Sequence, residues 1–340
     1  MEKEVIGINK ISMKVSIIIP SAGRRAEFLK RAIHSALIND DLIQTEIIVV
    51  LNGDAGMKFD TSLCIQHPLV HYYKIKDGNV SKARNFGIEI AKGELIRFLD
   101  DDDFLYPDVA YQQYLELFDS NADLSTYAGA IEDEFTRYQI IEPIDIADYC
   151  AATLSDKCPA LTFASVYKSN IIKNLRWDET ICVVEDEKWM RTIAANNDIK
   201  WIKQNHVVSV WYQHDVDRLS VPTYFANPEL FKNRCISIQE TLNTLQFQNR
   251  LTPLRLKAAS DGLWSCINGG FYFAPIYWTE VALYAKKINP QARPKNTFFD
   301  TLFFIDPILL EWLIIPLRWI SRYYRKIKSH IVKSAYVRKL

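Results

Sequence analysis

Four short apolar segments constrain the fold of this chain more than any other feature. Each is a continuous run of apolar residues, mainly β-branched or aromatic, which is typical of strands buried on both faces. Helical periodicity separates the first segment from the second and the third from the fourth. The order strand, helix, strand, strand, helix, strand predicts an α/β fold with a mostly parallel sheet covered on both faces. The four segments are residues 14–20, 46–53, 70–75 and 94–99.

Four consecutive aspartates, Asp100 to Asp103, follow the last of these strands directly. Because ligands of such sheets bind at the carboxyl ends of the strands, we expect the aspartates to face a binding crevice. Adjacent carboxylates repel one another and need a cation, and hard oxygen ligands favour magnesium, manganese or calcium. Asp100 and Asp102 could share one metal ion, or divide a metal ion and a ribose between them. The alternative is a solvated acidic turn that caps the next helix, predicted at residues 106–118, with Asp103 as a favourable N-terminal charge.

A helix predicted at residues 81–91 brings positive charge toward the same edge of the sheet. Ser81 is the expected N-cap of this helix, and its first turns carry Lys82, Arg84 and Asn85. Cations on a helix that begins near the crevice are what a diphosphate group would require. The helix therefore favours a diphosphate site over a simple acidic turn.

Three segments together resemble the family 2 glycosyltransferases, which are inverting enzymes of the GT-A fold that transfer a sugar from a nucleotide donor. The segments are KVSIIIPSAGRRAEFLKRAIHSAL, TEIIVVLNGD and DGNVSKARNFGIEIAKGELIRFLDDDD, and they cover roughly residues 14–108. The resemblance implies a Rossmann-like GT-A domain of the type that builds bacterial surface polysaccharides. Haloacid-dehalogenase phosphatases also place two aspartates after a strand, but there no A-R-N helix precedes the motif.

The resemblance also assigns a donor site along the carboxyl edge of the sheet. It implies that Arg84 reaches the nucleotide, that Asp100 lies near the ribose and that Asp102 binds a divalent manganese or magnesium ion. Asn52 stands where the family usually has an aspartate that binds the base, and its side chain can still accept a hydrogen bond. A UDP-sugar is the donor that the resemblance favours. The expected nucleotide-sugar-binding residues are Pro20, Asn52, Lys82, Arg84, Asp100 and Asp101, and the expected metal ligands are Asp102, Asp100 and His214.

Further along the chain, two acidic residues open a predicted helix and offer a base for an acceptor hydroxyl. Glu185 and Asp186 follow an apolar run, and Trp189, Met190 and Ile193 form the buried stripe of the helix. The pair resembles the E-D motif of the family, which implies that Asp186 is the catalytic base. Taken without the resemblance, the pair is also an ordinary acidic first turn, which the helix dipole favours.

A third segment that resembles the family lies at residues 207–220. An edge strand is expected to end at Tyr212, and His214 and Ser220 match a late element of the family that closes over the diphosphate. The resemblance implies that His214 ligates the metal ion or donates to a phosphate oxygen. Arg218 adds positive charge there. The alternative is a histidine in a surface loop.

Changes in periodicity and charge along the sequence divide the chain into three parts. We expect a GT-A domain at residues 1–222, with a nucleotide-binding half at 14–108 and an acceptor half at 109–222. A C-terminal helical extension is expected at 223–297, where helical periodicity replaces strand character. A basic amphipathic segment is expected at 298–340.

The C-terminal charge pattern predicts a membrane contact. The whole chain balances 41 basic residues against 41 acidic ones, but residues 317–340 hold eight basic residues and no acidic one. Apolar positions recur there at helical spacing, which is typical of a helix that binds an anionic membrane surface. A helix docked on the acidic body and an oligomer contact are the alternatives. Charges and prolines interrupt the apolar run at residues 303–320, so a spanning helix is not expected, and no module that reads nucleic acid is present.

Other features of the sequence favour a reducing compartment. The six cysteines lie far apart without a C-x-x-C pair, and the first twenty residues hold no apolar stretch of secretory length.

Together the features of the sequence predict a cytoplasmic enzyme, peripheral on the inner face of the cell membrane, that is an inverting, metal-dependent hexosyltransferase. Its acceptor is expected to be a saccharide, and a lipid-linked one is favoured. The alternatives are a catalytically silent nucleotide-sugar-binding or membrane scaffold protein and a GT-A-like nucleotidyltransferase.

Overall fold

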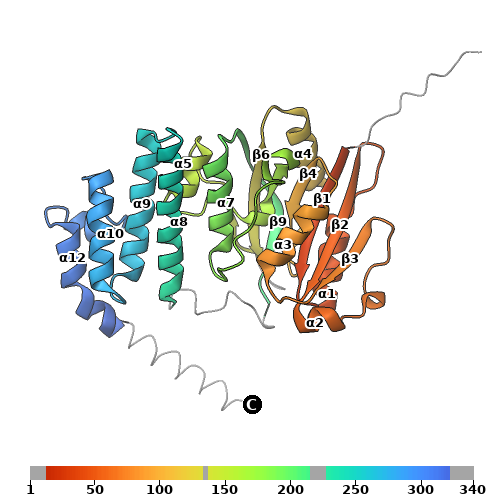
Figure 1. Ribbon diagram of the computed structural model, residues 1–340, viewed down its shortest axis with the longest axis horizontal. Helices are drawn as coiled ribbons and strands as arrows, with labels where there is room; N and C mark the ends of the chain where they lie inside the picture. Colours follow the sequence, from red (N-terminus) through yellow and green to blue (C-terminus); the bar gives the residue numbers. More distant parts are fainter. Residues whose placement is uncertain (1–12, 133–136, 215–226, 322–340) are drawn as a thin grey trace, which may run out of the picture. The chain divides into compact units, whose positions relative to one another are not determined.

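The computed structural model describes the chain over three stretches, residues 13–132, 137–214 and 227–321. The chain divides into two compact units, one built on a β-sheet and the other on α-helices (Figure 1). The sheet unit comprises residues 1–153 and 157–219. It contains all of the predicted site residues that the structure describes.

Within the described residues, nine strands form one mixed sheet in the order β3-β2-β1-β4-β8-β6-β9-β5, and β7 pairs with β6. The pairs β1–β2, β2–β3, β1–β4 and β6–β9 are parallel. The pairs β4–β8, β5–β9, β6–β7 and β6–β8 are antiparallel. The strands are β1 Met13–Ser21, β2 Ile43–Asn52, β3 Val70–Ile75, β4 Leu95–Phe98, β5 Phe104–Leu105, β6 Leu124–Glu132, β7 Arg137–Ile141, β8 Ser165–Lys168 and β9 Trp201–Tyr212.

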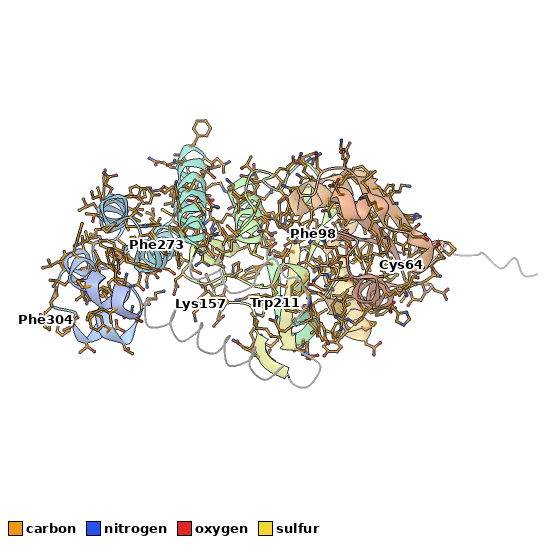
Figure 2. All side chains as sticks on the ribbon, turned by 90° about the horizontal axis from the view of Figure 1, so that it is seen from below. Cys64, Phe98, Lys157, Trp211, Phe273 and Phe304 are labelled. Carbon is orange, nitrogen blue, oxygen red and sulfur yellow. The ribbon has the colours of Figure 1, made fainter. Side chains whose placement is uncertain are left out.

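The four strands predicted from the apolar segments are confirmed as β1 to β4, and they pair in parallel as expected. In β1, residues 15–21 are buried without a break, because the sheet is covered on both faces. Phe98 of β4 lies among the packed side chains of this unit (Figure 2). The prediction that the strand ending at Tyr212 is an edge strand is wrong, because β9 lies between β6 and β5. The two residues of β5 are too few to give a pattern in the sequence.

Helices of the sheet unit connect and cover the strands. They are α1 Ala26–Ala36, α2 Gly53–Lys58, α3 Val80–Ile90, α4 Pro107–Asp119, α5 Tyr149–Leu154, α6 Ser169–Ile172 and α7 Glu185–Asn196, with single 3-10 turns at Thr61–Leu63 and Thr162–Ala164. Helix α1 buries Leu29 and Ile33 in the core that also holds β1, and α3 packs against β1 and β2. The predicted stripe Trp189, Met190 and Ile193 of α7 is buried, as expected.

Helix α3 begins differently from the prediction. Its N-cap is Asn79, whose Oδ1 accepts a hydrogen bond from the backbone N–H of Lys82 at 2.9 Å. Ser81 lies inside the first turn and is buried, so the predicted cap at Ser81 is wrong. The side-chain amide of Asn79 also donates to the backbone oxygen of Glu179 at 2.9 Å. This distant contact fixes the start of α3, and no local pattern could have indicated it.

The helical unit comprises residues 154–156 and 220–340. Its described helices are α8 Pro228–Phe247, α9 Pro253–Gly270, α10 Pro275–Ile288, α11 Thr297–Thr301 and α12 Pro307–Leu313. Several begin with proline in the first turn, where its missing N–H has no helical partner to lose. No helix in the described part of the chain is long and apolar enough to cross a bilayer. Most of the predicted basic helix, residues 322–340, lies outside the described residues.

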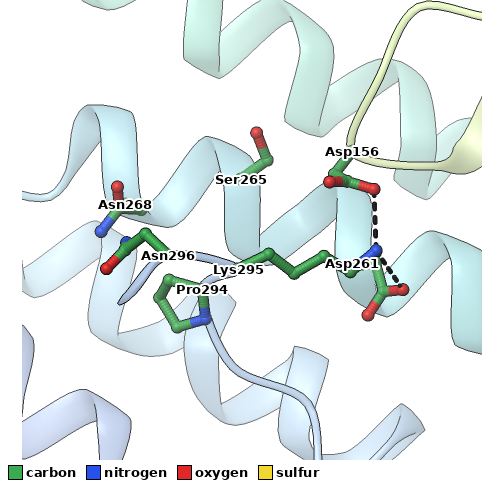
Figure 3. Close-up of a pocket in the computed structure, with 7 residues that line it drawn as sticks. All are labelled: Asp156, Asp261, Ser265, Asn268, Pro294, Lys295 and Asn296. Atoms are coloured by element: carbon green, nitrogen blue, oxygen red, sulfur yellow. Dashed lines mark hydrogen bonds and ion pairs between the residues drawn. The ribbon is translucent and has the colours of Figure 1, made fainter. Parts of the chain in front are cut away.

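Lys295 ties the short segment 154–156 to the rest of the helical unit. Its Nζ lies 2.9 Å from Asp156 Oδ1 and 2.9 Å from Asp261 Oδ2 on α9 (Figure 3). Next to Asp261, a Cβ at Gly262 would come within 2.2 Å of the backbone oxygen of Leu154. Only glycine allows this approach, so the segment packs directly against α9.

Candidate functional site

The candidate site lies where β1 and β4 end side by side. The two strands pair in parallel up to Ile18 and Phe98; β4 ends there, whereas β1 stays paired with β2 as far as Ser21. Pro20 lies beyond this ladder, where its missing N–H costs no hydrogen bond to β4. The loop 22–25 and the aspartates 100–103 therefore emerge next to each other, which is the place where parallel sheets bind ligands.

The four aspartates divide into two buried and two accessible side chains. Asp101 and Asp103 are 4% and 1% exposed. The side chains of Asp100 and Asp102 keep 38% and 20% of their surface accessible. The aspartates form a tight turn, in which the backbone N–H of Asp103 donates to the backbone oxygen of Asp100 at 3.2 Å, and the turn gives the four side chains different surroundings.

The two buried aspartates hold the site together. Asp103 Oδ1 accepts the backbone N–H of Tyr212 at 2.9 Å, and burial raises the pKa of Asp103 well above its usual range. The alternative role of Asp103 as a charge at the start of α4 is therefore wrong. Asp101 accepts the hydroxyl of Ser21 at 2.5 Å and Nη2 of Arg25 at 2.6 Å. Burial raises the pKa of Asp101 to about 6, although Arg25 opposes this shift.

Two arginines contact Asp102, one at its side chain and one at its backbone. Arg25 Nη1 lies 2.6 Å from Asp102 Oδ2, and Arg31 Nη2 donates to the backbone oxygen of Asp102 at 2.6 Å. The loop before Arg25 turns at Gly23, where φ is +68° and an added Cβ would meet the Cβ of Phe59 at 3.0 Å. This left-handed turn favours glycine, and it directs Arg25 to the aspartates.

His214 reaches the same carboxylate from the end of β9. Its Nε2 lies 2.9 Å from Asp102 Oδ2 and 2.8 Å from Arg25 Nη1. The side chain is 4% exposed and packs on the ring of Phe28, with centroids 4.8 Å apart. The alternative of a histidine in an exposed surface loop is therefore wrong.

The donor atoms of Asp102 and His214 suit a divalent cation. Neighbouring ligands of an octahedral ion with bonds of about 2.1 Å lie about 3.0 Å apart, and the two atoms here are 2.9 Å apart. Among the residues that the structure describes, no group of three or more His, Cys, Asp or Glu side chains could hold a metal ion. Two protein ligands are still compatible with magnesium, which is usually coordinated by one or two carboxylates together with substrate phosphates and water.

Arg84 gathers three carboxylates at the other end of the site. Its Nη2 donates to Asp100 Oδ1 at 2.9 Å, and its Nη1 lies 3.2 Å from Asp186 Oδ1 and 3.6 Å from Glu185 Oε1. The side chain is 3% exposed, and its guanidinium stacks 4.3 Å from the ring centre of Trp177. Burial opposes the charged form, but the carboxylates outweigh it and raise the pKa of Arg84. One buried cation thus connects the aspartates after β4 with the first turn of α7.

Asp186 has an environment suited to a base near neutral pH. The pKa of Asp186 is raised to about 7, with burial as the largest cause; Arg84 lowers this pKa, and Glu185 and Asp100 raise it. The side chain keeps 42% of its surface accessible, so water in the crevice moderates this shift. Burial also raises the pKa of Glu185. Val184, just before the pair, has φ of 59° and ψ of 23°, a left-handed conformation that is rare for a β-branched residue.

The remaining predicted residues have different surroundings. Asn52 donates from Nδ2 to the backbone oxygen of Ser21 at 3.0 Å, which joins the ends of β2 and β1. Lys82 forms a partly exposed ion pair with Asp77 at 2.7 Å rather than with an aspartate of the tetrad. Arg218 and Ser220 lie outside the described residues.

Sequence reasoning missed Ser21, Arg25 and Val184. Two adjacent arginines in the first loop are visible in the sequence, but nothing there distinguishes exposed Arg24 from half-buried Arg25. The left-handed conformation of Val184 has no signal at all, because valine is the wrong residue type for it.

Comparisons with known proteins agree with this arrangement. The sequence model of the glycosyl transferase family 2 matches residues 16–183. GgaB of Bacillus subtilis (strain 168), a minor teichoic acid biosynthesis protein, is 27% identical over 181 residues, which are 47% of this chain and 19% of GgaB. The GalNAc(5)-diNAcBac-PP-undecaprenol beta-1,3-glucosyltransferase of Campylobacter jejuni is 28% identical over 186 residues, 49% of this chain and 55% of that enzyme. This chain therefore spans less than two thirds of the length of either relative.

A solved structure is similar in fold. The structure of S. aureus TarS 1-349 in complex with UDP-GlcNAc matches with a TM-score of 0.60, 14% sequence identity and coverage of 82% of each chain. At this identity the likeness concerns the fold alone, which is the GT-A fold with C-terminal helices.

Proposed function

Residues 16–183 belong to the glycosyl transferase family 2, and from this premise we propose that the protein is an inverting glycosyltransferase. It would move a sugar from a UDP-sugar to a hydroxyl group of a saccharide acceptor. The observation that carries the proposal is the position of Arg84, which contacts Asp100 at 2.9 Å and Asp186 at 3.2 Å. A donor held near Asp100 would thus lie within reach of a base on α7.

The described side chains support a single displacement step. Asp186 would take the proton of the acceptor hydroxyl, and the acceptor oxygen would form a bond to the anomeric carbon as the bond from that carbon to the diphosphate oxygen breaks. Attack from the face opposite the diphosphate inverts the anomeric centre. Arg84 would orient Asp186 and hold its pKa near neutrality, because burial alone would raise that pKa further. Preorganised charges of this kind act most strongly in the transition state.

Asp102 and His214 would hold a divalent manganese or magnesium ion, whereas Asp100, the third predicted ligand, is paired with Arg84 instead. Such an ion, when bound, would neutralise the negative charge that develops on the leaving nucleoside diphosphate. The separation of 2.9 Å between Asp102 Oδ2 and His214 Nε2 supports this assignment.

Transfer of sugar to defined acceptors tests the proposal. We would incubate the full-length protein with UDP-sugars, manganese and saccharide acceptors with and without a polyprenyl diphosphate, as the names of the two relatives suggest. A new glycosidic product of inverted configuration, identified by mass spectrometry and NMR, is the expected result. Binding of UDP-sugars without transfer to any acceptor would instead support the nucleotide-sugar-binding scaffold.

Activity should depend on pH through the base. Because the pKa of Asp186 lies at about 7, kcat/KM is expected to rise about tenfold for each pH unit below this value and to level off above it. The sign follows from the mechanism, since only the deprotonated carboxylate can accept the proton. Initial rates at saturating manganese in overlapping buffers would measure the profile. A flat profile between about pH 5.5 and 8 would exclude a base that titrates in this range.

The helical unit supports a location at the inner face of the cell membrane. Leu309, Leu313, Leu317 and Ile320 recur at helical spacing and are 54%, 59%, 62% and 66% exposed, and we call them the apolar stripe. Phe304, before α12, is also exposed, at 71% (Figure 2). Seven basic residues and no acidic one follow between residues 321 and 340. Apolar residues next to dense positive charge are typical of a helix that lies on an anionic bilayer.

Binding to vesicles tests this location. The double variant Leu313→Glu and Leu317→Glu is expected to bind vesicles that contain phosphatidylglycerol at least about tenfold more weakly, because two apolar contacts are lost and two negative charges face anionic lipid. Cosedimentation measures the affinity. Phe247→Glu, at a residue 90% exposed on α8, is the matched control. Unchanged binding of the double variant, or a change from dimer to monomer instead, would contradict the membrane role of the apolar stripe.

A further inference from the structure

One guanidinium lies against the acidic edge of the site. Arg25 places Nη2 2.6 Å from Asp101 Oδ1 and Nη1 2.6 Å from Asp102 Oδ2, so that its fork spans two neighbouring carboxylates. The side chains of Arg25 and Asp102 are only 19% and 20% exposed. Water therefore competes poorly for this contact, unlike at an ion pair on the surface.

The same nitrogen of Arg25 also meets His214. Nη1 lies 2.8 Å from His214 Nε2, and this Nε2 lies 2.9 Å from Asp102 Oδ2. In the tautomer that leaves Nε2 unprotonated, Nε2 accepts a hydrogen bond from Nη1, because a guanidinium can only donate. An oxygen and a nitrogen thus direct electron pairs toward one cationic group. Carboxylate oxygen and neutral imidazole nitrogen are also ligands of divalent metal ions.

We propose that Arg25 acts as the internal counter-ion of the metal position formed by Asp102 and His214, and that it leaves this position only when a nucleoside diphosphate binds. The inference rests on the proposed function. A guanidinium and a divalent cation cannot occupy the same two ligand atoms, and their like charges repel each other at this distance. A diphosphate gives the displaced guanidinium a new anionic partner, since arginine binds phosphate oxygens through two parallel hydrogen bonds.

The consequence is that metal ion and nucleotide bind cooperatively. A metal ion alone must break the contacts of Arg25 with Asp102 and His214 and leaves Arg25 without a replacement. When UDP is present, Arg25 has an alternative anion and the cost of displacement falls. By linkage, UDP then raises the affinity for the metal ion by the same factor as the metal ion raises the affinity for UDP.

Direct measurement of bound manganese tests the proposal without an activity assay. Mn²⁺ is titrated into the full-length protein with and without saturating UDP, and free Mn²⁺ is measured by electron paramagnetic resonance. Arg25→Gln is expected to bind Mn²⁺ alone at least about tenfold more tightly than the wild type, and UDP should increase its affinity by a smaller factor. Arg25→Lys, which keeps the charge but not the fork, should lie between the two. Arg24→Gln changes the same charge at the exposed neighbouring residue and should behave as the wild type.

Three outcomes would overturn the proposal. The first is that Arg25→Gln binds Mn²⁺ no more tightly than the wild type and shows the same response to UDP. The second is that wild-type protein binds Mn²⁺ equally well with and without UDP, which decides the question even if Arg25→Gln does not fold. In both cases the protein still binds Mn²⁺, so the metal dependence of the proposed function is not contradicted. The third is that no variant binds Mn²⁺ even with UDP, and then the metal dependence fails as well.

Discussion

The Asp186→Asn variant is expected to transfer sugar between about a hundredfold and ten-thousandfold more slowly than the wild type, while its affinity for the UDP-sugar stays the same. This range is what a well-placed general base contributes. Asparagine has the shape of aspartate and can still accept a hydrogen bond from Arg84, which lies 3.2 Å away. It cannot take a proton from the acceptor. Steady-state kinetics and calorimetric titration with the UDP-sugar measure the two quantities.

Asp108→Asn is the matched control for this prediction. Asp108 is an acidic residue in the first turn of α4, as Asp186 is in the first turn of α7, but it is exposed and lies outside the Arg84 cluster. Its substitution should leave kcat unchanged. If Asp186→Asn retained most of its activity, the base would have to be another group, and Glu185 on the same turn would be the next residue to replace.

The Arg84→Met variant is expected to lose about 3 kcal/mol of its free energy of unfolding at pH 8. Three carboxylates would lose their shared cation, and the guanidinium would no longer stack on Trp177. The loss lies at the low end for a buried ion pair, because Asp100 and Asp186 keep 38% and 42% of their side-chain surface accessible. Urea unfolding followed by circular dichroism measures it.

The loss should be smaller at pH 5 than at pH 8. Without Arg84, which lowers the pKa of Asp186, the carboxylates of the folded variant take up protons more readily than those of the wild type. The repulsion among them therefore weakens as the pH falls through about 7. Arg84→Lys should be affected less, since it keeps one charge, and Arg24→Met, at an exposed residue, should change stability by less than about 0.5 kcal/mol. Equal losses at both pH values would show that Arg84 does not act as the counter-ion of these carboxylates.

Local patterns in the sequence predicted those parts of the fold and of the site that depend on local structure. The four buried strands and the helix of Glu185 and Asp186 follow from the period of a strand or a helix. The different exposure of the four aspartates depends on a turn and was not predicted. The roles of Arg84 and Asp186 came from the resemblance to a family and remain proposals for this chain. Their closeness in space agrees with those roles.

Features that depend on distant contacts could not be predicted. Arg25 and Asp101 are 76 residues apart, and the loop that joins them in space depends on the left-handed turn at Gly23. The cap of α3 fell on Asn79 instead of Ser81 because Glu179 binds the Asn79 side chain. Both Asn79 and Ser81 are good capping residues, so the sequence alone could not decide between them.

The contact of residues 154–156 with Lys295 limits how the protein can be divided into fragments. Residues 154–156 belong to the helical unit although residues on both sides of them belong to the sheet unit. A fragment that stops at residue 219 would therefore keep Asp156 but lose Lys295, the cation that Asp156 shares with Asp261 of α9. A single stop codon cannot yield a clean catalytic fragment, and a shortened gene would need a redesigned connection in place of residues 154–156.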